Sequence, residues 1–139
     1  MSIELPPDYH PSPNEDYMNS RQVEYFRRKL RQMRVDLLRE FRDDPPADQD
    51  RSTMEGDEAD MAEVEIDRER IQVSREHALL LLNQVDQALS RIADGSYGYC
   101  DETGEPIGLK RLEAQPTATL SLEAQERAEA RQRSEAGPG

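Results

Sequence analysis

The chain has one cysteine, Cys100, and no tryptophan among its 139 residues. A single cysteine excludes a disulfide within the chain and cannot supply the four protein ligands of a closed structural zinc site. Aromatic residues make up 5% of the sequence and hydrophobic residues 35%, too few for a large globular core. We therefore expect burial along a narrow helical seam and in one small cluster.

Long apolar runs, a leader sequence and an excess of positive charge are missing too. The longest run of large apolar residues is Leu79–Leu82, far shorter than the roughly 20 residues of a membrane-spanning helix. The opening MSIELPPDYH has neither the basic nor the apolar region of a secretory signal. With 18 basic and 30 acidic residues the net charge is −12, which disfavours direct binding to nucleic acids or anionic membranes. We expect a cytoplasmic protein.

The sequence does contain apolar residues at helical spacing. A first helix is predicted from about Asn19, with apolar residues every three or four positions on one face. Those residues are Val23, Phe26, Leu30, Met33, Leu37 and Phe41. Asn19 or Ser20 can cap the helix start, and Pro45 and Pro46 stop or sharply kink it.

A second helix is predicted from near Asp60 to about Ala93. Its apolar residues recur every seven positions, as the first position of a coiled-coil heptad does. They are Val64, Ile71, Ala78, Val85 and Ile92. The helix would be roughly 50 Å long at about 1.5 Å per residue, and Gly95 is placed to end it. The fold class is therefore mainly α, with the two helices folded back as an antiparallel coiled-coil hairpin.

The hairpin should occupy residues 19–94, with its tip near 55–62. We expect a flexible arm at 1–18, which is rich in proline. A small globular part at 95–134 should contain a C-terminal helix capped by Ser121, followed by a disordered tail at 135–139. The leucine run at 79–82 is predicted to pack against the C-terminal helix.

Charge is distributed unevenly along the hairpin. Residues 21–42 contain eight basic and three acidic residues (+5), whereas residues 43–69 contain twelve acidic and two basic residues (−10). Near the tip, Asp57 and Asp60 lie one helical turn apart, close to the small Ala62. The ordinary interpretation is a capping box formed by Asp60 and Glu63. The functional one is that these carboxylates face outward toward a cation, an arginine or an amide of a partner. The two are compatible.

The segment 97–124, which we call the knuckle, has the frame of a zinc finger without its ligands. After Cys100, a C-x-x-C pair would end at Thr103, and a second pair would fall at Ser121 and Ala124. We expect no metal here. Hydrophobic packing should close the turn instead, through Tyr97, Tyr99, Ile107, Leu109, Leu112 and Leu120. The sequence has no phosphate loop, nucleophile elbow or histidine pair, so we expect no enzyme and no catalytic residue.

Residues 17 to about 130 resemble the DksA/TraR family of bacterial RNA polymerase regulators. The resemblance is carried by YMNSRQVEYFRRKL, by D-x-x-D-x-A at Asp57, Asp60 and Ala62, and by YGYC followed by GEPIGLKRLEAQPTATL. It implies an antiparallel coiled coil joined to a zinc-finger domain. Members enter the secondary channel of RNA polymerase and alter open-complex stability without binding DNA, often with the alarmone ppGpp, as in the stringent response. The three tip residues would then be the determinants that act on the polymerase.

Two departures from the family follow. Only Cys100 survives of the four zinc-ligand positions, which resembles the low-cysteine, zinc-free members. Gln84, Gln115 and Gln125 stand where the resemblance implies basic residues that contact ppGpp, and glutamine pairs poorly with phosphates. The expected partner is RNA polymerase, bound by a monomer, with ppGpp as a candidate co-regulator.

Two other functions fit the residues. The tip carboxylates could hold Mg²⁺ and promote transcript cleavage by polymerase. Alternatively, the coiled coil could be a scaffold or chaperone for other partners.

Overall fold

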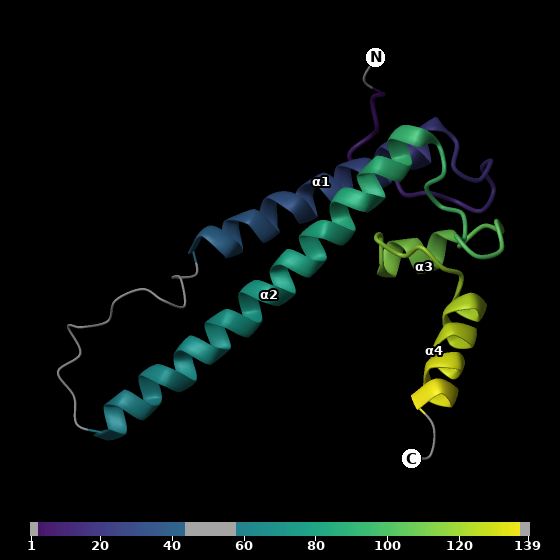
Figure 1. Cartoon of the computed structure of the whole chain (residues 1–139). Coiled ribbons are helices and arrows are strands. Elements are labelled where there is room, and N and C mark those ends of the chain that lie inside the picture. Colours follow the sequence, from purple (N-terminus) through teal and green to yellow (C-terminus); the bar gives the residue numbers. More distant parts are fainter. Residues whose placement is uncertain (1–2, 44–57, 137–139) are drawn as a thin grey trace.

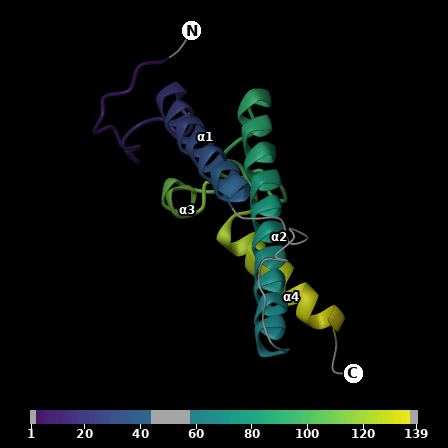
Figure 2. The same ribbon diagram turned by 90° about the vertical axis from the view of Figure 1, so that its left-hand side faces the viewer.

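The computed structural model describes residues 3–43 and 58–136 and is mainly helical, as predicted (Figure 1). Its helices are α1 (Ser20–Asp43), α2 (Glu58–Asp94), α3 (Leu109–Ala114) and α4 (Leu122–Ala136). The two long helices run antiparallel, and α1 lies beside the C-terminal half of α2 in both views (Figures 1 and 2). The short helices lie at the end of the hairpin where α1 begins and α2 ends. Within the described residues, no helix is both long and apolar enough to cross a membrane.

The seam between α1 and α2 is built from the predicted periodic positions. Phe26, Leu30 and Val85 are fully buried, and Ile92 is nearly so. The seam changes character toward the tip, where an arginine replaces the apolar residue. The guanidinium of Arg75 lies 3.8 Å from the centre of the Phe41 ring and donates a 3.0 Å hydrogen bond to the Phe41 carbonyl.

α2 extends well past its described partner helix. From Arg75 back to its first residue, Glu58, the helix continues for about 25 Å at ~1.5 Å per residue. Figure 1 shows this half of α2 projecting away from the rest of the described molecule. Among the described helices, the hairpin is therefore extended at this end by α2.

The helix ends form as their local sequences predict. The Asn19 side chain accepts a 2.9 Å hydrogen bond from the amide of Gln22, and the Ser121 hydroxyl accepts one of 3.2 Å from the amide of Ala124. Gly95 has φ of 85°, and the next amide, of Ser96, donates to the Arg91 carbonyl at 3.0 Å. That bond closes a Schellman motif, which needs a left-handed residue after the helix.

Two local predictions were wrong. α2 begins at Glu58, so Asp60 is already a helical residue and does not head a capping box at the helix start. The leucine run does not pack as expected either, since Leu79 is 51% and Leu80 55% exposed. These two side chains lie on the exposed side of α2, off the seam with α1. The prolines expected to stop α1 lie outside the described residues.

The N-terminal segment, residues 3–18, differs from the flexible arm that we expected. It is extended but is bound to the base of the hairpin, and we call it the arm. The Tyr17 hydroxyl donates to the Gly98 carbonyl at 2.7 Å and accepts from the Gly108 amide at 2.9 Å. The rings of Tyr9 and His10 stand edge-on to the ring of Tyr25 in α1. The arm is rich in proline, but its aromatic rings supply enough apolar contact area to hold it against α1.

Candidate functional site

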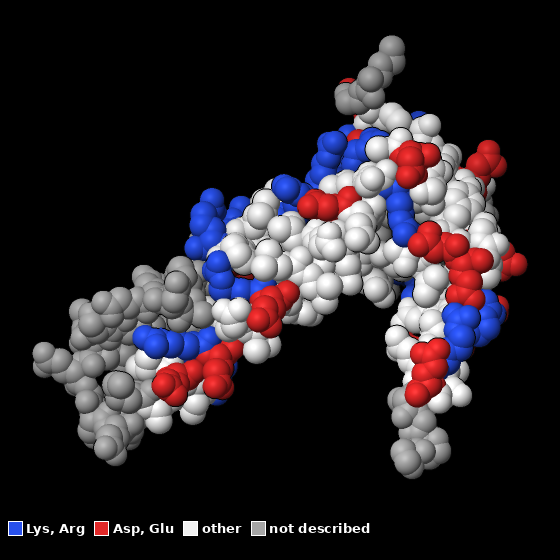
Figure 3. Space-filling view, viewed as in Figure 1, with Lys and Arg blue, Asp and Glu red and all other residues white. Residues whose placement is uncertain are grey.

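The expected tip is only partly covered by the structure. Asp57 lies outside the described residues. Asp60 is in the first turn of α2, and Ala62 is exposed. Farther along α2, the acidic side chains at 63, 65, 67 and 69 are all exposed, and Figure 3 shows acidic groups on this projecting half. The projecting half of α2 therefore has the acidic surface that the sequence predicts.

The knuckle is a tight turn closed by backbone hydrogen bonds. The amide of Cys100 donates to the Glu105 carbonyl at 2.7 Å, and the amide of Gly104 donates back to the Cys100 carbonyl at 2.8 Å. Gly98 is required at its start, because its φ is 93° and an added Cβ would lie 2.7 Å from the Met18 side chain. The arm is thus in close contact with the knuckle backbone.

The four positions of the zinc-finger frame come together around Cys100. Its side chain is buried, which disfavours the thiolate, but the Thr103 hydroxyl and the amides of Ser121, Thr103 and Glu102 hydrogen-bond to it. These bonds lower the thiol pKa from 9.0 to about 6. Ala124, the fourth position, is fully buried next to the Ser121 cap.

This donor set does not fit a four-cysteine zinc site. Cys100 is the one thiolate, Thr103 and Ser121 offer only hydroxyls, and the methyl group of Ala124 has no donor atom. Within the described ranges, no three His, Cys, Asp or Glu side chains group as metal ligands. Zinc prefers thiolate, imidazole and carboxylate ligands, so the side chains at these four positions do not match its preferred ligand set.

Apolar packing closes the knuckle, largely as predicted. Tyr97, Ile107 and Leu112 are buried in the same cluster as Cys100 and Ala124, with Leu109 and Leu120 packed against it. The cluster is continuous with the hairpin seam through Phe26, whose ring centre lies 5.8 Å from that of Tyr97. Tyr99 is the exception. It is 36% exposed and packs edge-on against Tyr17 instead.

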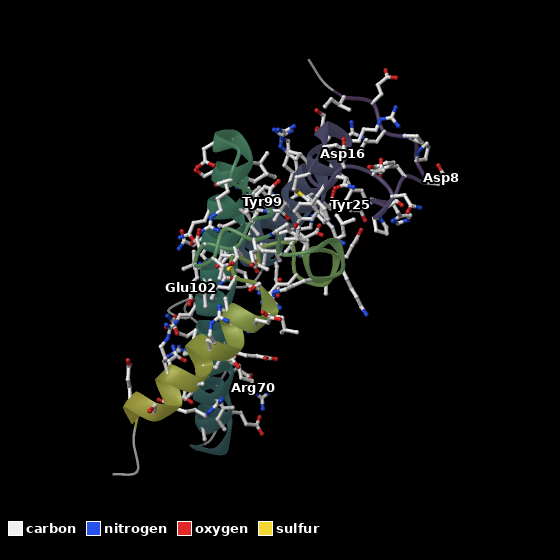
Figure 4. All side chains as sticks on the ribbon, turned by 90° about the vertical axis from the view of Figure 1, so that its right-hand side faces the viewer. Asp8, Asp16, Tyr25, Arg70, Tyr99 and Glu102 are labelled. Carbon is white, nitrogen blue, oxygen red and sulfur yellow. The ribbon has the colours of Figure 1, made fainter. Side chains whose placement is uncertain are left out.

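Ion pairs also tie the knuckle region to each long helix. Arg91 of α2 meets Asp101 at 2.7 Å, and Lys29 of α1 meets Glu113 at 2.9 Å. Glu102, which is labelled in Figure 4, pairs with Arg131 of α4 at 3.3 Å. Such part-exposed pairs contribute up to about 1 kcal/mol each, so they orient the knuckle more than they stabilise it.

The three glutamines singled out in the sequence line one hollow of about 210 Å³. Gln84 comes from α2, Gln115 follows α3, and Gln125 is in α4. Among the described residues that line it, Arg111 is the only charged one. Its guanidinium is already engaged, because it donates to the Leu120 carbonyl at 2.9 Å and to the Gln125 side chain.

Sequence reasoning missed Arg111 and Tyr17. Arg111 enters the hollow only because the knuckle folds back onto α2, and no local pattern in the sequence announces that contact. Tyr17 is separated by 81 and 91 positions from its two hydrogen-bond partners. The YGYC motif was a signal for a tight turn, but not for what would pack on it.

Comparison with known proteins agrees with this architecture. Residues 95–130 match the family model of the prokaryotic dksA/traR C4-type zinc finger. The chain is 52% identical over 126 residues to the RNA polymerase-binding transcription factor DksA of Caulobacter vibrioides, covering 91% of this chain and 89% of that protein. This chain belongs to the DksA/TraR family. It is also 33% identical over 129 residues to DksA of Escherichia coli K12, covering 93% of this chain and 85% of the relative.

Solved structures of the DksA/TraR family show the same fold. The transcription factor DksA2 from Pseudomonas aeruginosa superposes with a TM-score of 0.67 at 42% identity, covering 84% of this chain and 90% of that one. The RNA polymerase binding protein and transcriptional regulator Dks from Chlamydia trachomatis gives a TM-score of 0.50 at 26% identity, covering 81% and 93%. The matched zinc-finger region is the knuckle and the first part of α4, where this chain lacks three of the four cysteines.

Proposed function

We propose that this protein is a transcription regulator that binds RNA polymerase through its secondary channel and alters the stability of promoter open complexes. The observation that carries the proposal is the projecting half of α2, an acidic helical segment about 25 Å long. This segment is joined to a rigid base, and the chain is 52% identical to an RNA polymerase-binding transcription factor. A thin acidic rod can enter a narrow pore and is repelled by bare DNA.

In this proposal the protein is a monomer that acts in the cytoplasm, where its partner is, and is not an enzyme. Asp57, Asp60 and Ala62 act at the end of the rod. Carboxylates there can accept hydrogen bonds from arginines or amides of the moving parts of the polymerase. The knuckle folds without zinc, and its packed cluster fixes the angle between the hairpin and α4.

The alarmone ppGpp is a candidate co-regulator with a weak site on this chain. The hollow lined by Gln84, Gln115 and Gln125 offers neutral amides, and its one guanidinium is already bonded to the protein. A nucleotide with several phosphates gains most from cations that are free to pair with it. We therefore propose that regulation by this protein depends little on ppGpp.

The decisive experiment compares Asp60→Asn with Asp67→Asn. Both substitutions remove one negative charge from α2, and Asp67 is an exposed position two turns farther from the tip. Purified polymerase should co-elute with both variants. Transcription from a ribosomal promoter should respond to Asp67→Asn as to the wild type, whereas Asp60→Asn should have lost the effect.

Each failure has its own meaning. Normal regulation by Asp60→Asn would overturn the tip assignment while leaving the polymerase proposal in place. If polymerase does not retain the wild-type protein, the proposal itself falls and a scaffold with other partners replaces it. Shortened transcripts that appear in arrested complexes only when the protein is added would instead establish the cleavage function.

A further inference from the structure

The face of α1 that points away from α2 is basic and partly apolar. At 100° per residue, six exposed side chains at three-, four- and seven-residue spacing fall on the half of α1 that faces away from the buried seam. They are Arg28, Arg31, Val35, Leu38, Arg39 and Arg42, and we call them the outer strip. Figure 3 shows basic side chains following this edge of α1. The outer strip is therefore a second amphipathic face on a helix whose first face is already buried.

The two aliphatic residues of the outer strip are unusual for a solvated basic face. Val35 is 48% exposed and Leu38 38% exposed, with arginines before and after them on the same side of the helix. A single exposed aliphatic residue needs no explanation. Two of them one turn apart, bracketed by Arg31 and Arg39, match the pattern by which one helix receives another.

The outer strip leads into a hollow at its N-terminal end. The arm crosses α1 there and leaves a space of about 440 Å³. The hollow is lined by Leu5, Pro6, Pro7, Tyr9, Tyr25, Arg28, Lys29 and Gln32. Arg28 belongs to both features, and it is held in place by a 2.7 Å hydrogen bond to the Ile3 carbonyl. Strip and hollow thus form one continuous surface through Arg28, on which basic and apolar side chains are interspersed.

We propose that the outer strip and this hollow are a docking surface for an acidic, amphipathic helix of a protein partner. Charge complementarity is the main argument. Residues 21–42 carry +5 in a chain whose net charge is −12, so this is where an acidic surface is attracted. Across the described part of the chain, Arg31 and Arg39 form no ion pair. The acidic residues Asp36 and Glu40 lie on the flank of the strip, and Asp36 accepts a hydrogen bond from Gln32 at 2.9 Å.

A helix fits this surface better than a nucleic acid or a membrane. From Arg28 to Arg42 the strip is about 21 Å long at ~1.5 Å per residue, the length of four helical turns. Glutamates of a partner helix would meet the arginines, while its leucines would cover Val35 and Leu38. A nucleic acid binds mainly through its phosphates and gains little from aliphatic side chains. An extended anionic surface, whether a nucleic acid or a membrane, would also meet the acidic half of α2, which repels it. The proposal concerns a surface that the tip-based function does not use.

The test uses the full-length protein and a fluorescein-labelled model peptide. The peptide is a helix of about 14 residues, with glutamate and leucine at three- and four-residue spacing. Binding is followed by fluorescence anisotropy, and the same peptide with glutamine in place of glutamate is the neutral probe. We expect saturable binding of the acidic peptide that weakens with added salt, and at least tenfold weaker binding of the neutral probe.

The matched variants are Arg31→Glu with Arg39→Glu, against Lys110→Glu with Arg133→Glu. Each double variant lowers the net charge by four, and Lys110 and Arg133 are exposed positions away from α1. The first double variant should bind the acidic peptide about tenfold more weakly, as expected when exposed ion pairs become repulsions. The second should bind as the wild type does. Leu38→Ser should weaken binding roughly threefold or more without a change in charge.

Circular dichroism checks that each variant is folded. If the variant with Arg31→Glu and Arg39→Glu is not folded, the variant with Arg31→Gln and Arg39→Gln takes its place. Three outcomes would overturn the proposal. One is the absence of saturable peptide binding. Another is an equal loss in both double variants, which would mean non-specific electrostatic attraction. The third is tighter binding to single-stranded RNA, duplex DNA or phosphatidylglycerol vesicles than to the peptide, which would assign the strip to that ligand.

Discussion

Tyr17 is the residue through which the arm holds the knuckle, and its removal gives a sharp test of the fold. Tyr17→Phe deletes only the hydroxyl, which bridges the Gly98 carbonyl at 2.7 Å and the Gly108 amide at 2.9 Å. The ring, and with it the edge-on contact to Tyr99, is kept. Whatever stability is lost therefore belongs to the two hydrogen bonds.

The expected loss is about 2 kcal/mol in the free energy of unfolding. A hydrogen bond contributes a net ~1 kcal/mol, and a buried group left without a partner costs roughly 1–3 kcal/mol. Gly98 is buried, whereas Gly108 is half-buried and can recover water. For a protein of this length, about 2 kcal/mol corresponds to a fall of roughly 8 °C in Tm.

Urea unfolding followed by circular dichroism measures this loss. Limited proteolysis gives a second readout, because a released arm is cleaved faster than a docked one. Tyr99→Phe is the matched control, since within the described residues its exposed hydroxyl makes no hydrogen bond. It should change the free energy by less than about 0.5 kcal/mol. Equal stability and equal cleavage rates for Tyr17→Phe and Tyr99→Phe would refute the anchoring role of Tyr17.

Two further predictions concern Cys100 and the metal. The folded protein holds the pKa of the Cys100 thiol near 6, below its ordinary 9.0, so the thiolate stabilises the fold. Relative to Cys100→Ser, the wild type should gain unfolding free energy as pH rises from 6 to 9, and should lose that advantage as pH falls through 6. A pH-independent difference between the two would contradict this. A strong chelator should leave the wild-type Tm unchanged, whereas Thr103→Cys, Ser121→Cys and Ala124→Cys together should create a zinc-dependent Tm. A chelator-induced drop in the wild type would mean that a metal is bound after all.

Much of the hairpin could be predicted from the sequence because its determinants are local. The seven-residue repeat of apolar side chains that includes Val85 and Ile92 lies within one segment. Burying these side chains needs only a partner helix. The end signals at Asn19, Gly95 and Ser121 act within a few residues of themselves. These features appear in the structure as predicted.

The arm and the hollow could not be predicted in the same way. Tyr17 and Arg111 acquire their roles from contacts between distant segments. The proline content of the arm predicts flexibility, but composition gives no information on the residues that the arm contacts. The capping box at Asp60 failed for a related reason. The pattern fits a helix start, but α2 begins at Glu58, and helix starts are decided by competition between neighbouring candidates.

The continuous core has a consequence for how the molecule opens. Phe26 joins the hairpin seam to Tyr97 of the knuckle, and Tyr17 bonds the arm to the knuckle at Gly98 and Gly108. Base, knuckle and arm should therefore unfold as one cooperative unit. The half of α2 before Arg75 lacks such support from any described helix, and its exposed acidic residues repel one another. Its amides should exchange with solvent first, so the proposed working end is also the least stable part of a rigidly mounted rod.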